Sequence, residues 1–214
     1  MTSQSPTEQS QSLEALQDIK RMMERSSRFI SLSGLSGVSA GICALIGAFI
    51  AHTWIIDYYK DYDRSGYSRE EAIFLEWRLL GLGVAVLLAA LATSSWFTWR
   101  KARKNQLPMW DHASKKLAIN MAIPLGAGGL FVLGLINHAD WVDVTPTCLV
   151  FYGLALVNSS KYTLTDIRYL GILEIILGII SMYYPHLGLY FWGFGFGVLH
   201  IIYGLIMWWK YERS

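Results

Sequence analysis

The sequence predicts an all-α fold, a polytopic membrane bundle of six transmembrane helices with an amphipathic interfacial helix at the N-terminus. Three observations predict it. The chain of 214 residues is 53% hydrophobic and only 16% charged, which is too apolar for an ordinary soluble domain. Several apolar runs reach the roughly 20 residues that a helix needs to cross the hydrocarbon of a bilayer. Basic residues are also dense on alternate connecting segments, as in multi-pass membrane proteins.

The first 28 residues are polar or charged and divide into two parts. Residues 1–12 are rich in Ser, Gln and Thr and are predicted to be a disordered tail. In residues 13–28, Leu13, Leu16 and Ile19 recur at helical spacing against charged side chains. We expect this amphipathic helix on the cytoplasmic membrane surface, although a solvated helix that packs on a partner or on a second copy fits the pattern too. No secretory cleavage pattern precedes the first apolar run, which is therefore expected to remain as an anchor.

Residues 29–214 are predicted to form the transmembrane domain. Its six expected spans are residues 29–55, 74–99, 117–136, 142–158, 167–184 and 187–209. The charged segment 57–71 is expected to be an outer loop between the first two spans. Pro124 is expected to kink the third span. Because Pro185 and His186 leave almost no loop between the last two spans, these should form a tight antiparallel hairpin.

The distribution of lysine and arginine predicts the orientation, because these residues gather on the cytoplasmic side of short loops. With the N-terminus inside, 14 of the 18 basic residues fall on the inner side and 4 on the outer side. The inner residues are Lys20, Arg21, Arg25, Arg28, Arg100, Lys101, Arg103, Lys104, Lys115, Lys116, Lys161, Arg168, Lys210 and Arg213, and the outer ones are Lys60, Arg64, Arg69 and Arg78. Six spans then put both termini in the cytoplasm, and the expected location is the inner membrane.

Only two ionisable side chains lie well inside a predicted span: Glu174 in the fifth and His200 in the sixth. Charge in hydrocarbon is costly, so such residues are functional candidates by default. Counted outward from the Pro185 turn, their depths agree within roughly 6 Å at about 1.5 Å per residue. The sequence therefore predicts that Glu174 and His200 face each other, or share a water, inside the bundle.

Two interpretations of this pair stay open. It could respond to protons or bind a solute, or it could be a structural polar clip that fixes the pairing of two helices. Further polar side chains could join Glu174 in a cluster: Asn120, Asn158, Tyr169 and Tyr203. Interhelical amide hydrogen bonds of this kind are commonly structural and are worth about 1 kcal/mol or less.

Glycines at helical spacing predict the faces on which helices pack closely. They are Gly34, Gly37 and Gly41 in the first span, Gly171 and Gly178 on the face of Glu174, and Gly193, Gly197 and Gly204 on the face of His200. The glycine face of the first span would suit a homodimer contact as well as an internal one.

Several classes of function are not indicated. The sequence has no nucleotide-binding loop, no zinc-protease helix and no GxSxG elbow, so we expect no enzyme and no catalytic residues. Cys43 and Cys148 lie in apolar runs, and no Cys or His cluster has ligand spacing, so neither a metal site nor a cofactor is expected. Nucleic acid is not an expected partner; the lipid bilayer is.

The last hairpin, from Tyr169 to Trp209, carries glycines and a proline at a distinctive spacing: Gly171, Gly178, Pro185, Gly197 and Gly204. Over about 40 residues this spacing resembles the repeated hairpin of the HdeD-like acid-resistance membrane proteins. The resemblance implies six helices arranged as three in-out-in hairpins. The first four spans depart from it, with a long charged outer loop and with Pro146 after a polar turn. The whole chain also resembles six-helix membrane proteins of Bacteroidetes, which implies a location but no activity.

Two hypotheses of function follow. The first is a non-enzymatic membrane protein that acts in envelope stress or as the membrane partner of a cytoplasmic protein. The second is a small proton- or solute-linked transporter or channel that uses Glu174 and His200. Broken helices or an inverted repeat would favour the second hypothesis.

Overall fold

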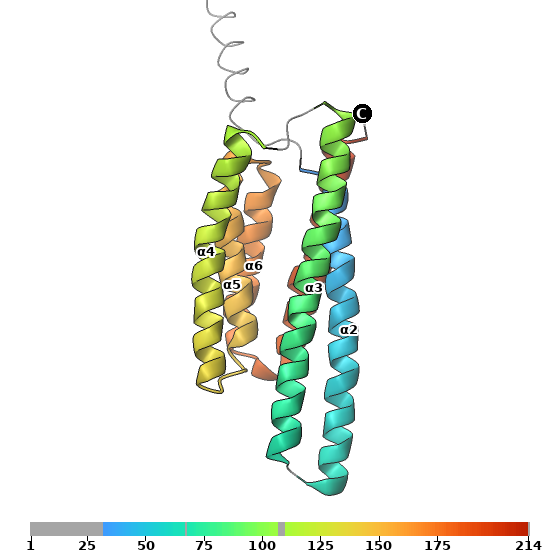
Figure 1. Cartoon of the computed structure of the whole chain (residues 1–214), viewed down its shortest axis with the longest axis vertical. Helices are drawn as coiled ribbons and strands as arrows, with labels where there is room; N and C mark the ends of the chain where they lie inside the picture. Colours follow the sequence, from blue (N-terminus) through green and yellow to red (C-terminus); the bar gives the residue numbers. More distant parts are fainter. Residues whose placement is uncertain (1–31, 67, 107–109, 214) are drawn as a thin grey trace, which may run out of the picture.

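The computed structural model describes residues 32–66, 68–106 and 110–213, and this part of the chain consists of helices and short turns with no strand (Figure 1). The all-α class is therefore confirmed for the described residues. The predicted tail at 1–12, the predicted amphipathic helix at 13–28 and the predicted start of the first span at 29–31 lie outside them.

The helices in chain order are α2 (Gly34–Ser65), α3 (Arg69–Lys104), α4 (His112–Asn137), α5 (Val144–Ser159), α6 (Asp166–Met182), α7 (Gly188–Trp192) and α8 (His200–Tyr211). Two 3-10 turns, η1 (Ser160–Tyr162) and η2 (Pro185–Leu187), and a π-helical segment, η3 (Gly193–Leu199), complete the list. Four helical stretches are long and apolar enough to cross a membrane: α2, α3, α4 and the continuous run Pro185–Tyr211. The helices α5 and α6, with 16 and 17 residues, are shorter than the roughly 20 residues that a span usually needs.

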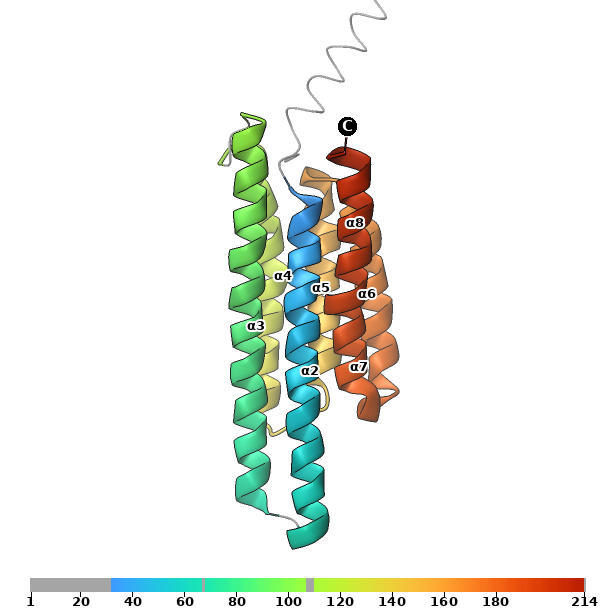
Figure 2. The ribbon, with the colours of Figure 1, turned by 90° about the vertical axis from the view of Figure 1, so that its right-hand side faces the viewer.

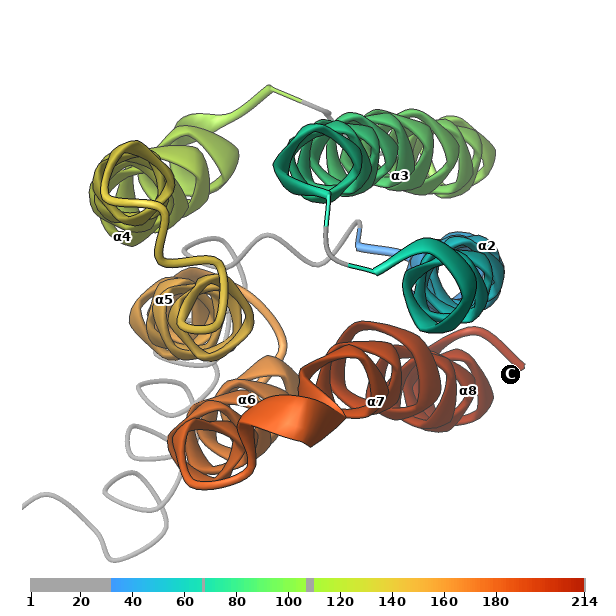
Figure 3. The same cartoon turned by 90° about the horizontal axis from the view of Figure 1, so that it is seen from below.

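The helices form one curved row when they are seen from below (Figure 3). In this row α2 lies between α3 and α8, α5 lies between α4 and α6, and α6 meets the last span in the middle. The ends of the row are α3 and α4. In the most apolar 18-residue stretch of each helix, the share of residues buried within the protein is 0% for α3 and 6% for α4. Apolar surface on this scale requires cover from outside the chain, as lipid would give.

The first connection differs from the loop expected at 57–71. Helix α2 continues past residue 55 to Ser65 and ends where Gly66 adopts a φ of 81°. Lys60 and Asp57 form an i, i+3 ion pair on the extended part, and no proline interrupts it. Ser68 then caps α3 by accepting from the backbone N–H of Glu71 at 3.4 Å. The apolar pattern located the point near residue 55 where the side chains become polar. Helix α2 does not end at that point.

The third helix begins at a capping box and passes through its proline. The backbone N–H of Ser114 donates to the Asp111 carboxylate at 2.7 Å, and the Asp111 N–H donates to the Ser114 hydroxyl at 2.8 Å. Pro124 lies inside α4, which continues to Asn137. In the glycine-rich stretch after it, Gly128 contacts the Phe151 side chain of α5, whereas Gly126 and Gly129 face open space.

The last predicted span, 187–209, is not one regular helix. It consists of η2, the short α7, the π-helical η3 and α8. Three of the seven residues of η3 are glycines, Gly193, Gly195 and Gly197. Glycine has no side chain to resist an irregular backbone, and π-helical segments occur frequently at functional sites.

The glycine stripes pack as helix contacts, but with different partners from those expected for a hairpin. A Cβ at Gly41 would lie 2.6 Å from the Gly197 carbonyl oxygen, and a Cβ at Gly204 would lie 2.6 Å from the Val38 nitrogen. Helix α2 therefore touches η3 and α8 through their backbones, and both views show α2 and α8 side by side (Figures 2 and 3). The glycine face of the first span makes an internal contact.

The glycines of α6 pack on α5. A Cβ at Gly171 would lie 2.7 Å from the Gly153 carbonyl oxygen, and a Cβ at Gly178 would lie 2.8 Å from the Val150 side chain. The last two spans are indeed joined by the single turn η2, yet each has its main contact elsewhere, α6 on α5 and α8 on α2. This leaves only limited contact between α6 and the last span, and Glu174 and His200 lie in it.

Candidate functional site: a buried carboxyl beside an imidazole

Glu174 is completely buried. Its side chain has 0% exposure, and among the described residues neither carboxyl oxygen has a hydrogen-bond partner. The close packing of Gly171 and Gly178 on α5 sets this face of α6 against its neighbours. A carboxylate with no donor in an apolar interior is costly, whereas a carboxylic acid is tolerated.

His200, at the start of α8, is 6% exposed and is bonded at both ring nitrogens. Its Nδ1 lies 3.0 Å from the Gly195 carbonyl oxygen, and its Nε2 lies 2.7 Å from the Tyr152 hydroxyl. A carbonyl oxygen can only accept, so Nδ1 carries a proton in this arrangement. In the neutral ring Nε2 then accepts from Tyr152, and the imidazole is fully satisfied without a charge.

The structure brings together the two residues that the sequence singled out. Glu174 Oε1 lies 3.5 Å from His200 Nδ1. This separation is longer than a good N–H···O hydrogen bond of about 2.9 Å. The Nδ1 proton therefore goes to the Gly195 carbonyl, and a small shift of either side chain would transfer that bond to the carboxyl.

The π-helical segment builds this geometry. The Gly195 carbonyl that His200 bonds lies five residues before it in the chain. A Cβ at Gly195 would lie 2.5 Å from Glu174 Oε2, so only glycine lets the carboxyl approach the backbone this closely. Because π-helical turns are wider than α-helical ones, a change between the two forms would move this carbonyl relative to Glu174.

Aromatic rings surround the imidazole. The Phe196 ring lies 5.1 Å from that of Tyr152 and stacks on His200 at 6.1 Å, and Trp192 lies 5.4 Å from Phe196, all between centroids. Tyr152 and Phe196 were not among the residues predicted from the sequence. The signal for Tyr152 was a hydroxyl next to Gly153 in an otherwise apolar span, but nothing local linked it to His200, which is 48 residues away.

The wider polar cluster that was expected around Glu174 does not assemble. Asn158 donates to the Asn120 carbonyl and side-chain oxygens at 2.9 and 3.3 Å, which joins α5 to α4. Neither amide is bonded to Glu174, because both Glu174 oxygens lack partners within the described ranges. Tyr169 is 57% exposed, and Tyr203 packs against the hydrophobic core. Asparagine pairing and the Glu174 site are therefore separate features.

A second polar cluster, unforeseen from the sequence, closes one end of the bundle. The Glu212 carboxylate accepts from the Gly34 N–H at 2.5 Å and from the Ser33 hydroxyl at 3.2 Å, and it lies 3.4 Å from Lys101 Nζ. Lys101 also donates to the Leu32 carbonyl at 2.7 Å. We call these contacts the terminal clasp; they tie the C-terminal residues to α2 and α3.

Asp166, at the start of α6, makes a similar tie to the end of α8. It accepts from Lys210 at 3.2 Å and from the Tyr211 hydroxyl at 2.8 Å. The hydrogen bond with Tyr211, and then that with Asp166, raise the pKa of Lys210. Burial, with a contribution from Asp166, raises the pKa of Tyr211. Both ties lie at the end of the bundle where lysine and arginine are dense.

The comparisons add no assignment. The chain matches no family model, no curated protein and no solved structure. Within the described part of the chain no three His, Cys, Asp or Glu side chains are grouped so that they could hold a metal ion.

Proposed function

We propose that the chain is a multi-pass protein of the inner membrane that crosses the bilayer six times with both termini in the cytoplasm. The four long apolar stretches support this topology, and so does the packing of α5 and α6 into the same row. The two shorter helices, of 16 and 17 residues, would cross the bilayer with the help of η1 and the flanking turns. The basic residues Lys101, Lys115, Lys161 and Lys210 lie near helix ends on the same side of the bundle, which suits the cytoplasmic side.

Within this topology the proposed function is a small proton-linked transporter in which Glu174 takes up and releases the proton. The observation that carries the proposal is the fully buried Glu174 carboxyl, which has no hydrogen-bond donor among the described residues and lies 3.5 Å from His200. A structural clip would be expected to satisfy its own polar groups, because an unsatisfied buried group costs about 1–3 kcal/mol. A site that exchanges a proton needs a titratable group that other hydrogen bonds do not already hold in one protonation state.

The π-helical segment of the last span is a second line of support. Such segments occur frequently at functional sites, because they change which backbone carbonyls are available to side chains. Here η3 ends at Leu199, immediately before His200, and its Gly195 carbonyl bonds the imidazole. Protonation of Glu174 would change which group holds the Nδ1 proton and so the balance between the two forms of this segment.

The test is proton movement in proteoliposomes that enclose a pH-sensitive dye, with a potassium diffusion potential as the driving force. We expect the wild type to acidify the lumen faster than protein-free liposomes do, and Glu174→Gln to abolish the difference. Glu70→Gln, which alters an exposed carboxyl on α3, is the matched control and should behave as the wild type. Equal rates for the wild type and Glu174→Gln would refute a proton path through Glu174.

The competing role, a membrane partner for a cytoplasmic protein, is favoured by one observation. Arg100, Arg103, Lys104, Lys115 and Lys116 are all exposed around the connection between α3 and α4. A basic surface of this kind would attract an acidic partner. This role predicts no proton movement in either form of the protein, so the same proteoliposome experiment separates the two.

A further inference from the structure

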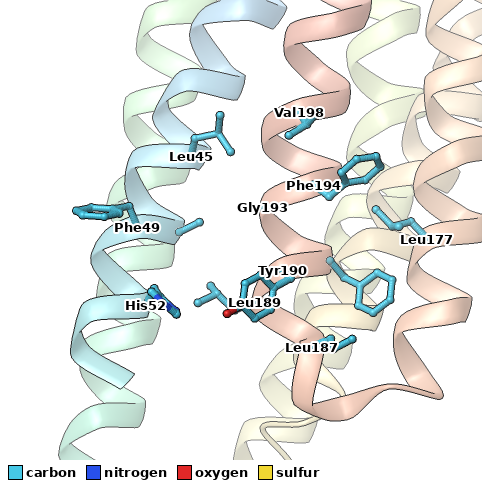
Figure 4. A pocket seen from close by; sticks show the side chains of 12 residues that line it. Leu45, Phe49, His52, Leu177, Leu187, Leu189, Tyr190, Gly193, Phe194 and Val198 are labelled. Atoms are coloured by element: carbon cyan, nitrogen blue, oxygen red, sulfur yellow. The ribbon is translucent and has the colours of Figure 1, made fainter. Parts of the chain in front are cut away.

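An apolar pocket of about 690 Å³ lies between α2, the last span and α6 (Figure 4). Leu45 and Ala48 line it from α2, Phe194 and Val198 from η3, and Leu177 from α6. Its volume falls within the roughly 300–1,000 Å³ of small-molecule sites, which are also mostly apolar.

The polar side chains of the pocket are gathered at one end. His52 and Tyr190 lie close together there, with ring centroids 6.0 Å apart in an edge-to-face contact. Figure 4 shows them at the opposite end from Leu45 and Val198. Among the residues that the structure describes, neither side chain has a hydrogen-bond partner. From His52 to Leu45 the α2 wall is seven residues, or about 10 Å, long at 1.5 Å per residue.

Leu177 connects the pocket to the buried carboxyl. It lines the pocket, and its Cδ2 lies 3.1 Å from the point where a Gly195 Cβ would be. Glu174 Oε2 lies 2.5 Å from the same point. One leucine side chain therefore separates the pocket from the proposed proton site, and the π-helical segment forms a wall of both.

We propose that this pocket binds a single-chain amphiphile of the fatty-acid class. Its apolar chain would lie along the groove between α2 and η3, and its head group would meet the His52 imidazole and the Tyr190 hydroxyl. If the protein is the proton-linked transporter proposed above, this ligand class is its substrate. Only the role of the ligand as a substrate rests on that proposed function. The binding site itself stands on the shape and polarity of the pocket.

The alternative occupant is an acyl chain of the surrounding phospholipid. The pocket lining is apolar apart from His52 and Tyr190, and these two side chains, which have no hydrogen-bond partner among the described residues, could bond a small head group. These features favour a single-chain ligand, and they give the experiment two arms, one for a free fatty acid and one for a phospholipid.

The experiment uses the purified full chain in phosphatidylcholine nanodiscs. The probe is a fatty acid with a photoreactive diazirine in its chain, and mass spectrometry locates its adducts. We expect adducts on the segments 45–52 and 187–198, with at least a tenfold loss of labelling when excess unlabelled dodecanoic acid is present. A diazirine-bearing phosphatidylcholine should label the exposed faces of α3 and α4 and leave these segments unlabelled.

Two kinds of variant test the pocket itself, one by filling its volume and one by removing its polar groups. Ala48→Phe fills the pocket and should abolish the competed labelling, whereas Leu87→Phe, on the exposed face of α3, should retain it. His52→Ala combined with Tyr190→Phe adds no volume and should weaken the competition by dodecanoic acid. Labelling that resists competition, that persists in Ala48→Phe, or that the phospholipid probe reproduces would overturn the proposal. Glu174→Gln should still be labelled, so a failure of the proton mechanism would be seen separately.

Discussion

The Tyr152 hydroxyl lies 2.7 Å from His200 Nε2, and this contact determines which ring nitrogen faces Glu174. With Nε2 accepting from α5, the protonated Nδ1 is directed to the Gly195 carbonyl at 3.0 Å and towards Glu174 Oε1 at 3.5 Å. Three helical elements thus meet at one imidazole. In the part of the chain that the structure describes, the carboxyl beside it has no donor, and four predictions rest on this arrangement and on the terminal clasp.

Substitution of Tyr152 by phenylalanine should destabilise the fold by about 1–3 kcal/mol, because Nε2 would be left buried without a partner. It should also free the ring to change tautomer. Nitrogen NMR shifts of labelled His200 would report the tautomer, and denaturant unfolding the stability. An unchanged nitrogen spectrum in Tyr152→Phe would mean that the hydroxyl does not orient the ring.

The thermal stability of the wild type should fall as pH rises between about pH 5 and 8, because a glutamate of the unfolded chain is ionised in this range, whereas the buried Glu174 is tolerated only as the neutral acid. The sign follows from Glu174. The neutral acid is tolerated in its donor-free site, and ionisation there removes stability from the folded state alone. Glu174→Gln should remove this slope, and the matched Glu70→Gln should keep it. Parallel curves for the wild type and Glu174→Gln, measured in detergent, would identify the pair as a structural clip.

Alanine at Gly195 should disturb the site at close range. Its Cβ would lie 2.5 Å from Glu174 Oε2 and 2.7 Å from the Leu149 side chain, so we expect a loss of about 1–3 kcal/mol, as for other overpacked sites. Gly83→Ala on α3 is the matched control, because a Cβ there meets nothing within 4 Å. It should be neutral or stabilising by up to about 1 kcal/mol. Equal melting temperatures for the two variants would contradict the close approach of Glu174.

The terminal clasp should contribute to stability. Lys101→Met leaves the Glu212 carboxylate, whose side chain is only 14% exposed, without its cation, and we expect a cost of about 1–3 kcal/mol. Lys60→Met is the control, since Lys60 and Asp57 form an exposed pair worth less than about 1 kcal/mol. Chemical unfolding of both variants with Glu212→Gln, as a double-mutant cycle, would measure the coupling. A coupling energy near zero would show that the Lys101–Glu212 contact does not contribute to the stability of the fold.

Part of the candidate site was accessible from sequence. Glu174 and His200 stand out because they are ionisable residues in apolar runs, and the agreement of their depths within roughly 6 Å follows from helical rise alone. Tyr152, Phe196 and the terminal clasp were not accessible. Tyr152 lies 44 positions from Phe196 and 48 from His200, the clasp contacts join residues 69 or more positions apart, and the local pattern around each residue is ordinary.

The sequence by itself determined the helical class, the approximate positions of the apolar runs and the glycine faces, because helical period and hydrophobicity are local properties. It did not determine where helices end outside the apolar runs, as α2 shows by continuing to Ser65. Only the tertiary structure decided that the glycines of α6 pack on α5 and those of the last span on α2. Small-residue faces are interchangeable in composition, so their pairing depends on the shape of the whole row, and that pairing placed Glu174 and His200 together without filling the space around the carboxyl with donors.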